Sequence, residues 1–151
     1  MRLSHPYVFV IGIVCVVLFF VAVGAVKLWR TLRWPVVQRE RRGWIKRTAR
    51  VQKWEHLAGT AFRLELVVPL DVAPERYRAG RDSVVLRGVV FLPEELGARL
   101  EGREELPLRI RSMESWLLNI DLEAILGDDA APVERAAYMS NGGAWRFTPI
   151  G

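Results

Sequence analysis

The sequence predicts a single N-terminal transmembrane α-helix followed by a small, mainly β domain with little helix. The first observation behind this prediction is an uncharged, proline-free apolar run from Tyr7 to Val26. As a helix this run is about 30 Å long, the thickness of a bilayer's hydrocarbon core. The second is that short segments beyond Trp44 alternate apolar and polar residues, as half-buried strands do. We expect about five to seven short strands in a barrel or a sandwich, because closure or stacking buries the apolar face of such strands.

Four segments follow from these patterns. They are a short tail at residues 1–6, the transmembrane helix at 7–28, a basic juxtamembrane linker at 29–43 and the β-rich domain at 44–151. Proline lacks an amide hydrogen and disfavours a helical residue before it. Pro35 therefore predicts that the helix breaks near Trp34.

The strands of the domain are predicted by alternation and bounded by turn residues. We expect strands at 44–52, 62–68, 84–92, 106–110 and 116–122. Gly88 interrupts the third of these and predicts a bulge or close packing. Residues 71–81 are expected to form a loop and 93–100 a short helix that opens on proline and acids.

The sequence also makes predictions for two segments near the C-terminal end. Residues 116–122 fit a strand, and they also fit the start of a helix that ends at Gly127. Asn141 and Gly142 are typical of a tight hairpin, because that turn needs positive φ angles. We therefore expect paired strands at 136–139 and 144–147.

The distribution of basic residues predicts the orientation. Only Arg2 and the α-amino group precede the apolar run, whereas residues 27–53 contain ten bases and one acid, giving +9. The positive-inside rule then places the C-terminal domain in the cytoplasm. We expect the membrane to be a cell inner membrane. The alternative is a cleaved signal peptide or the opposite topology, with a secreted or periplasm-facing domain. Small residues at Val23-Gly24-Ala25 favour cleavage, while the length of the run and the bases behind it favour retention.

The basic segment is also the predicted membrane-surface site. Each base near an anionic bilayer contributes about 1 kcal/mol, and tryptophans commonly anchor at the interface. The residues assigned to this site are Lys27, Trp29, Arg30, Arg33, Trp34, Arg39, Arg41, Arg42, Lys46 and Arg47. From Trp54 onward there are eleven arginines and sixteen acids, giving −5. An acidic domain argues against nucleic-acid binding, which needs a basic patch on the folded domain.

Patterns that carry chemistry are few. The sequence has no zinc-type, nucleophile-elbow, phosphate-loop or dinucleotide motif, and its one cysteine lies within the apolar run. His56 stands beside Glu55 and could sense pH, but a lone loop histidine usually has no such role. The acid pairs at 94–95, 104–105 and 128–129 read as solvated turns. We expect no enzyme activity, catalytic residue, cofactor or metal.

The order of features is similar to that of a known family. The residues concerned are Leu100-Glu-Gly102, then Leu106-Pro-Leu-Arg-Ile110, then Ile120-Asp121. They resemble a group of bacterial single-pass proteins whose small β-domain is catalogued as a domain of unknown function. The resemblance covers about residues 43–122 and implies a fold but no catalytic residue. The turn at Ser112-Met113-Glu114 departs from it, because the aspartate and proline of the family's turn are missing.

The function expected from these observations is a membrane-anchored, non-enzymatic β-domain that serves as a protein-interaction or assembly module. Its exposed sheet edges or loops would bind a protein partner, since such edges are templates for strand addition. The expected partners are anionic lipid headgroups, a protein of unknown identity and, weakly, other copies of the chain.

Overall fold

A computed structural model describes residues 5–151 except 72, 74 and 142. Predictions that involve Arg2, Pro74 or Gly142 lie outside the described residues. The chain separates into two compact units, Met1–Arg39 and Glu40–Gly151, and each is treated by itself. The boundary between them falls a few residues before the predicted start of the domain at residue 44.

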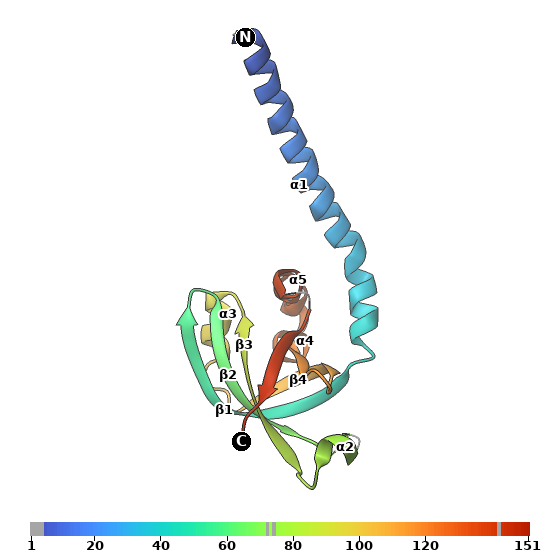
Figure 1. The fold of residues 1–151 in the computed structure, drawn as a ribbon, viewed down its shortest axis with the longest axis vertical. Helices are drawn as coiled ribbons and strands as arrows, with labels where there is room; N and C mark the ends of the chain where they lie inside the picture. Colours follow the sequence, from blue (N-terminus) through green and yellow to red (C-terminus); the bar gives the residue numbers. More distant parts are fainter. Residues whose placement is uncertain (1–4, 72, 74, 142) are drawn as a thin grey trace. The chain divides into compact units, whose positions relative to one another are not determined.

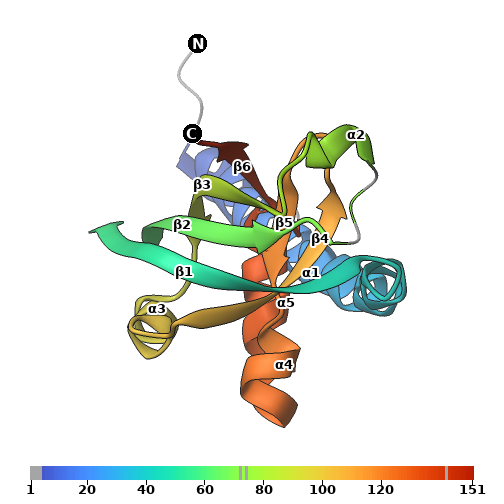
Figure 2. The ribbon, with the colours of Figure 1, turned by 90° about the horizontal axis from the view of Figure 1, so that it is seen from below.

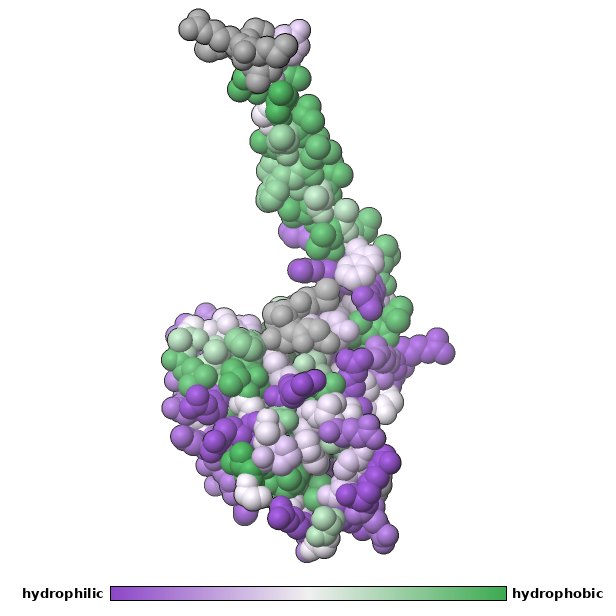
Figure 3. Space-filling view, viewed as in Figure 1, coloured by the Kyte–Doolittle hydropathy of each residue, from purple (hydrophilic) through white to green (hydrophobic). Residues whose placement is uncertain are grey.

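Helix α1 (His5–Arg41) forms the first unit as far as Arg39, and its last two residues belong to the second unit. Over the apolar run the side chains of α1 are exposed: Phe9 and Phe20 expose 72% and 68% of their surface. Trp34 and Val37, nearer the end of the helix, are buried. The most apolar stretch has a mean hydropathy of 3.1, and the helix is long and apolar enough to cross a membrane. Figure 3 shows hydrophobic colouring along this stretch and hydrophilic residues where the basic segment begins. The predicted apolar helix is confirmed, although a signal sequence would have the same length and composition.

The predicted helix break near Trp34 is wrong, because α1 continues through Pro35 to Arg41. A proline inside a helix removes one amide donor, here the partner of the carbonyl of Thr31. One turn earlier, the hydroxyl of Thr31 donates to the carbonyl of Lys27, 3.0 Å away. One missing hydrogen bond weakens this turn without ending the helix.

The second unit is a closed antiparallel barrel of six strands (Figures 1 and 2). The strands are β1 (Ile45–Ala58), β2 (Ala61–Pro69), β3 (Ser83–Phe91), β4 (Glu105–Ser112), β5 (Leu117–Ile120) and β6 (Trp145–Pro149). Their order around the barrel is β1-β2-β3-β6-β5-β4. The short helix α2 (Glu75–Arg78) follows β2, and α3 (Glu94–Leu100) joins β3 to β4. The predicted mainly β domain with little helix is thereby confirmed, as a barrel.

The interior of the barrel is aliphatic, as the alternation predicts. In β2 every second residue is buried, from Phe62 to Val68. The fully enclosed side chains from the other strands include Leu86, Leu106, Leu108, Ile110, Leu118 and Ile120. Burying one such side chain stabilises the fold by about 1.5–3 kcal/mol, so this core is the main source of stability.

Two glycines allow aromatic rings to lie against the backbone. A Cβ at Gly88 would lie within 2.6 Å of the ring of Phe147, its partner in β6. The register of β2 with β3 is continuous across Gly88, so the prediction of close packing is confirmed and no bulge forms there. A Cβ at Gly97 of α3 would collide with the ring of Phe62.

The C-terminal region contains more helix than predicted. Residues 117–120 form β5, and Leu122–Leu126 then form α4, which ends at Gly127, so each of the two readings of this segment is half right. A 3-10 turn at Gly127–Asp129 leads into α5 (Ala130–Asn141). The predicted hairpin is therefore wrong in its first strand, whereas its second strand corresponds to β6. The asparagine that suggested a hairpin turn ends a helix instead.

Candidate functional site

The predicted membrane-surface residues fall on both units. Five of them lie in α1 and are exposed: Lys27, Trp29, Arg30, Arg33 and Arg39. Trp34 also lies in α1, but it is only 8% exposed and so does not fit the prediction of a surface anchor. Trp29 is 55% exposed, and the guanidinium of Arg33 lies 4.9 Å from its ring centroid. Arg42 is exposed, the Lys46 side chain is 68% exposed and the Arg47 side chain is 20% exposed. Their contact with lipid stays a prediction.

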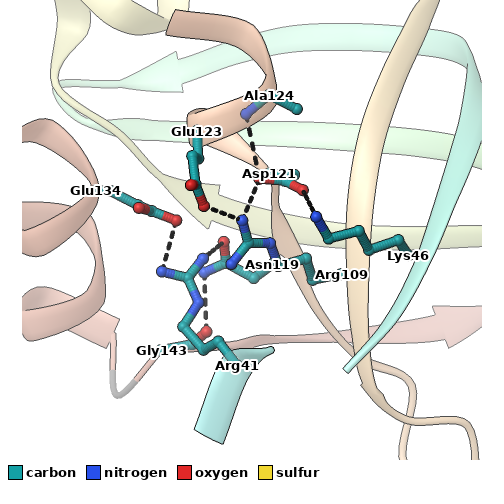
Figure 4. A network of polar contacts seen from close by, with 9 residues as sticks. All are labelled: Arg41, Lys46, Arg109, Asn119, Asp121, Glu123, Ala124, Glu134 and Gly143. Carbon is teal, nitrogen blue, oxygen red and sulfur yellow. Dashed lines mark hydrogen bonds and ion pairs between the residues drawn. The ribbon is translucent and has the colours of Figure 1, made fainter. Parts of the chain in front are cut away.

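Arg41 does not fit this prediction, because only 1% of its surface is exposed. Its Nη1 lies 2.6 Å from Oε1 of Glu134 in α5, and its Nη2 donates to Oδ1 of Asn119 in β5 at 2.8 Å. Nδ2 of Asn119 in turn donates to the carbonyl of Gly143. A guanidinium so enclosed cannot reach a lipid headgroup, so Arg41 belongs to the interior of the domain (Figure 4).

A second cation extends the network. Nη2 of Arg109 in β4 donates to Oδ1 of Asp121 at 2.7 Å and to Oε2 of Glu123 at 2.6 Å. Asp121 also accepts a hydrogen bond from the amide of Ala124 and so caps α4. Nζ of Lys46 lies 3.9 Å from Oδ2 of Asp121. We call these residues the ion network: Lys46, Arg41, Arg109, Asn119, Asp121, Glu123 and Glu134 (Figure 4).

The ion network contains three cations and three carboxylates, and the pKa shifts follow from its burial. Burial disfavours the charged form of Asp121, but the hydrogen bond and charge of Arg109 outweigh it and lower the pKa of Asp121. Burial likewise opposes the charge of Arg109, yet its two carboxylate partners raise its pKa. For Arg41 burial prevails over Glu134 and lowers the pKa, although an arginine stays charged at neutral pH.

The elements that carry these charges explain why they meet. Arg109 and Asn119 alternate with the core residues of β4 and β5, so their side chains point out of the barrel. Helix α5 presents Ala130, Glu134 and Ala137, which are buried and share one face at helical spacing. That face covers the outward side chains. The network was missed in the sequence because alternation alone marks an outward residue as exposed.

One sequence signal could have revealed the network. Glu134 lies midway between two buried alanines on the apolar face of α5, and a buried carboxylate needs a cation. This signal depends on α5 being a helix. Pro132 lies in the first turn of α5, where proline commonly marks the start of a helix.

The ion network is charge-balanced, and its centre is buried while Lys46 and Glu123 are exposed at its margin. This arrangement has a structural character. A general acid or base would need a pKa close to the working pH, whereas Asp121 is held ionised. Nε2 of His56 lies 2.8 Å from the carbonyl of Gly59, and its ring stacks on Phe62. Among residues 5–151, outside the three gaps, no group of three His, Cys, Asp or Glu could hold a metal ion.

A different surface is open to solvent, and we call it the arginine groove. It has a volume of about 320 Å³ and lies where α2, the start of β3, Trp116 and the end of β6 meet. Its lining residues are Leu70, Arg76, Tyr77, Arg78, Ala79, Arg81, Val84, Trp116 and Pro149. Three of these carry a positive charge and none carries a negative one, so the groove suits an anionic ligand with an apolar part.

The three arginines are not equivalent. Arg78 donates to the carbonyls of Asp71 and Ala73 at 2.6 and 2.7 Å, which ties its guanidinium into the loop. Arg76 makes an exposed ion pair with Glu114 at 3.3 Å and lies over the ring of Tyr77. The side chain of Arg81 donates to the carbonyl of Gly151 at 3.4 Å. Arg76 and Arg81 are therefore the arginines able to turn toward a ligand.

Backbone strain concentrates in the same groove. Within the part of the chain that the structure describes, Ala79 (φ 43°) and Trp116 (φ 46°) are the non-glycine residues with positive φ. Left-handed backbone costs a residue with a Cβ about 1–2 kcal/mol. Such outliers cluster at functional sites, and both of these line the groove. Desolvation and a hydrogen bond with Glu114 raise the pKa of Tyr77, which keeps this phenol neutral.

No protein-family model, curated protein or solved structure matches the chain. The resemblance to single-pass proteins with a small β-domain therefore stays a prediction, and the function must be argued from the residues.

Proposed function

We propose that the protein is a single-pass, membrane-anchored and non-enzymatic module that holds its barrel at the cytoplasmic face of a bacterial inner membrane, where the barrel binds a protein partner. The observation that carries this proposal is helix α1, whose apolar side chains are exposed over the length of a bilayer. Leaving so much apolar surface in water is costly, and lipid removes that cost. The bases that follow the apolar run favour the cytoplasmic orientation.

The non-enzymatic part of the proposal is supported by the two charge clusters. The ion network has a buried centre at Arg41, Arg109 and Glu134, and its exposed members Lys46 and Glu123 lie in ion pairs. Paired charges of this kind support a structural role rather than chemistry on a substrate. The arginine groove is open, but arginines and aromatic rings without a nucleophile or base bind ligands rather than convert them. Binding is the activity that these side chains support.

The arginine groove is a better candidate for partner binding than the predicted sheet edge. The pairing of β1 with β4 ends at Arg50, so residues 52–58 of β1 have an edge away from β2. Two register shifts and the charges of Lys53 and Glu55 lie along this stretch. Bulges and charged side chains are the devices that prevent strand addition.

The alternative function is that of a secreted or periplasm-facing barrel, with the N-terminal segment acting as a signal peptide. Val23-Gly24-Ala25 favours it, because small residues stand at the positions that a signal peptidase reads. Cleavage after Ala25 would leave the basic segment at the start of the mature protein.

A reporter fused after Gly151 separates the two functions. Alkaline phosphatase folds only outside the cytoplasm, so we expect an inactive fusion of full length in the membrane fraction. The matched control reverses exposed bases, changing Lys27, Arg30, Arg33, Arg39 and Arg42 to glutamate, and should activate the enzyme by removing the orienting charge. Arg41 is left unchanged because its burial would confound the result. An active phosphatase on the unmodified chain, or a cleaved soluble product, would contradict the proposal.

A further inference from the structure

The arginine groove sets two chemical requirements for whatever fills it. Arg76 and Arg81 are exposed and favour carboxylates, with which a guanidinium makes paired hydrogen bonds. Leu70, Val84 and Trp116 line the same groove and favour an apolar side chain. An exposed aromatic residue followed closely by two acids would satisfy both requirements.

A segment with this chemistry lies at the opposite end of β3. Phe91, the last residue of that strand, is 42% exposed, compared with 40% for Leu57 and 36% for Ile45. Glu94 and Glu95 follow in the first turn of α3, and both are exposed. We call Phe91–Glu95 the acidic segment.

We propose that the acidic segment of one copy of this chain occupies the arginine groove of a second copy. The inference rests on the proposed role as an interaction module and names its partner. Phe91 would contact the rings of Tyr77 and Trp116, while Glu94 and Glu95 would pair with Arg76 and Arg81. Charge complementarity between two exposed surfaces supports this occupant.

The two surfaces cannot meet within one chain. The groove includes Val84 at the start of β3, and the acidic segment begins at Phe91, where the strand ends. A strand rises about 3.3 Å per residue, so these residues lie about 23 Å apart. The contact must therefore join different surfaces of two copies, either head to tail or in reciprocal pairs around a two-fold axis. Attachment to a common bilayer would raise the local concentration of copies and favour the contact.

The test is cross-linking of the full chain in native membranes. Cys15→Ser removes the single native thiol. Ser83→Cys then marks the groove and Thr60→Cys marks the acidic segment, since the carbonyl of Thr60 bonds the amide of Leu92. Ser83 and Thr60 are both exposed and uncharged, so the substitutions leave the charges of the arginine groove and of the acidic segment unchanged. One chain with Ser83→Cys is co-expressed with another that carries Thr60→Cys, and a short bis-maleimide is added. We expect at least tenfold more cross-linked dimer than when all chains carry the cysteine at the same position.

Charge reversal supplies the control. Arg76→Glu with Arg81→Glu should abolish the cross-link, Glu94→Arg with Glu95→Arg should also abolish it, and combining both pairs should restore it. If Arg76→Glu with Arg81→Glu abolishes the cross-link and adding Glu94→Arg with Glu95→Arg does not restore it, the groove binds another acidic protein. That result would overturn self-association. Self-association through this contact would also be overturned if chains marked at the same position cross-link as well as chains marked at 83 and 60. The absence of a cross-link in every combination would overturn it too. The phosphatase fusion, measured on the same membranes, reports separately whether the anchored function stands.

Discussion

The buried and the exposed arginines of the domain differ in what surrounds their charge. Arg41 and Arg109 are at most 2% exposed, and carboxylates from α4, from its N-cap Asp121 and from α5 lie within hydrogen-bonding distance. Arg76 and Arg81 are exposed and line a groove that contains no acidic residue. The comparison teaches that the same side chain serves the fold where buried carboxylates hold it. It remains available for a ligand where it is exposed, even in an exposed ion pair such as that of Arg76 with Glu114.

The largest expected effect comes from removing a buried cation. Arg41→Ala leaves Glu134, which is 3% exposed, without its guanidinium partner. Breaking a buried pair costs about 3–5 kcal/mol, so the unfolding temperature should fall by more than about 10 °C. Thermal unfolding of the full chain in detergent, followed by tryptophan fluorescence, measures it.

Arg42→Ala is the matched control, because the adjacent Arg42 is exposed. It should change stability by no more than about 0.5 kcal/mol. Equal effects of the two substitutions would show that the burial of Arg41 does not matter for stability.

A smaller effect is expected when the charge of Asp121 is removed without removing its shape. Asp121→Asn keeps an acceptor for the amide of Ala124 but weakens the bond from Arg109, at a cost of about 1.5–3 kcal/mol at neutral pH. Because the folded-state pKa of Asp121 is lowered, its contribution is complete above its unfolded pKa of about 3.9 and is lost as pH falls through the folded value.

The stability difference between the unmodified chain and Asp121→Asn should therefore shrink as the pH drops below about 4. Unfolding temperatures of both chains, measured from pH 7 down to pH 3, test this. A difference that stays constant over that range would mean that Asp121 titrates alike in the folded and unfolded states.

The smallest effect concerns the strain in the arginine groove. Ala79→Gly relieves a φ of 43° at an exposed position and should stabilise the domain by up to about 1 kcal/mol. Ala136→Gly, at an exposed position inside α5, should instead destabilise it by about 1 kcal/mol. If both substitutions destabilise the domain alike, the positive φ of Ala79 carries no strain.

The parts of the fold that the sequence predicted are those governed by local periodicity. The alternation in β2 marked its buried residues, and the uncharged run marked α1. Gly88 indicated close packing, which the ring of Phe147 provides. In each of these cases a pattern within one segment is sufficient for the prediction.

Features that depend on contacts between distant segments were not predicted. Alternation marks Arg109 and Asn119 as outward-facing, and only the later helix α5 turns that outward face into a buried one. The hairpin prediction failed for a related reason, since asparagine and glycine end helices as readily as they form turns. The arginine groove collects residues from four places in the chain, so no single segment reveals it.

The most direct measurement of this account compares Arg41→Lys with Arg81→Glu in two assays, thermal unfolding and membrane cross-linking between positions 83 and 60. Lysine keeps the charge of Arg41 but not the two-pronged contact with Glu134 and Asn119. We predict that Arg41→Lys lowers the unfolding temperature but leaves cross-linking unchanged at temperatures where the domain is folded. We predict that Arg81→Glu abolishes cross-linking and leaves the unfolding temperature unchanged. The separate roles of the two arginines are contradicted if Arg81→Glu destabilises the domain as much as Arg41→Lys, or if Arg41→Lys alone abolishes the cross-link.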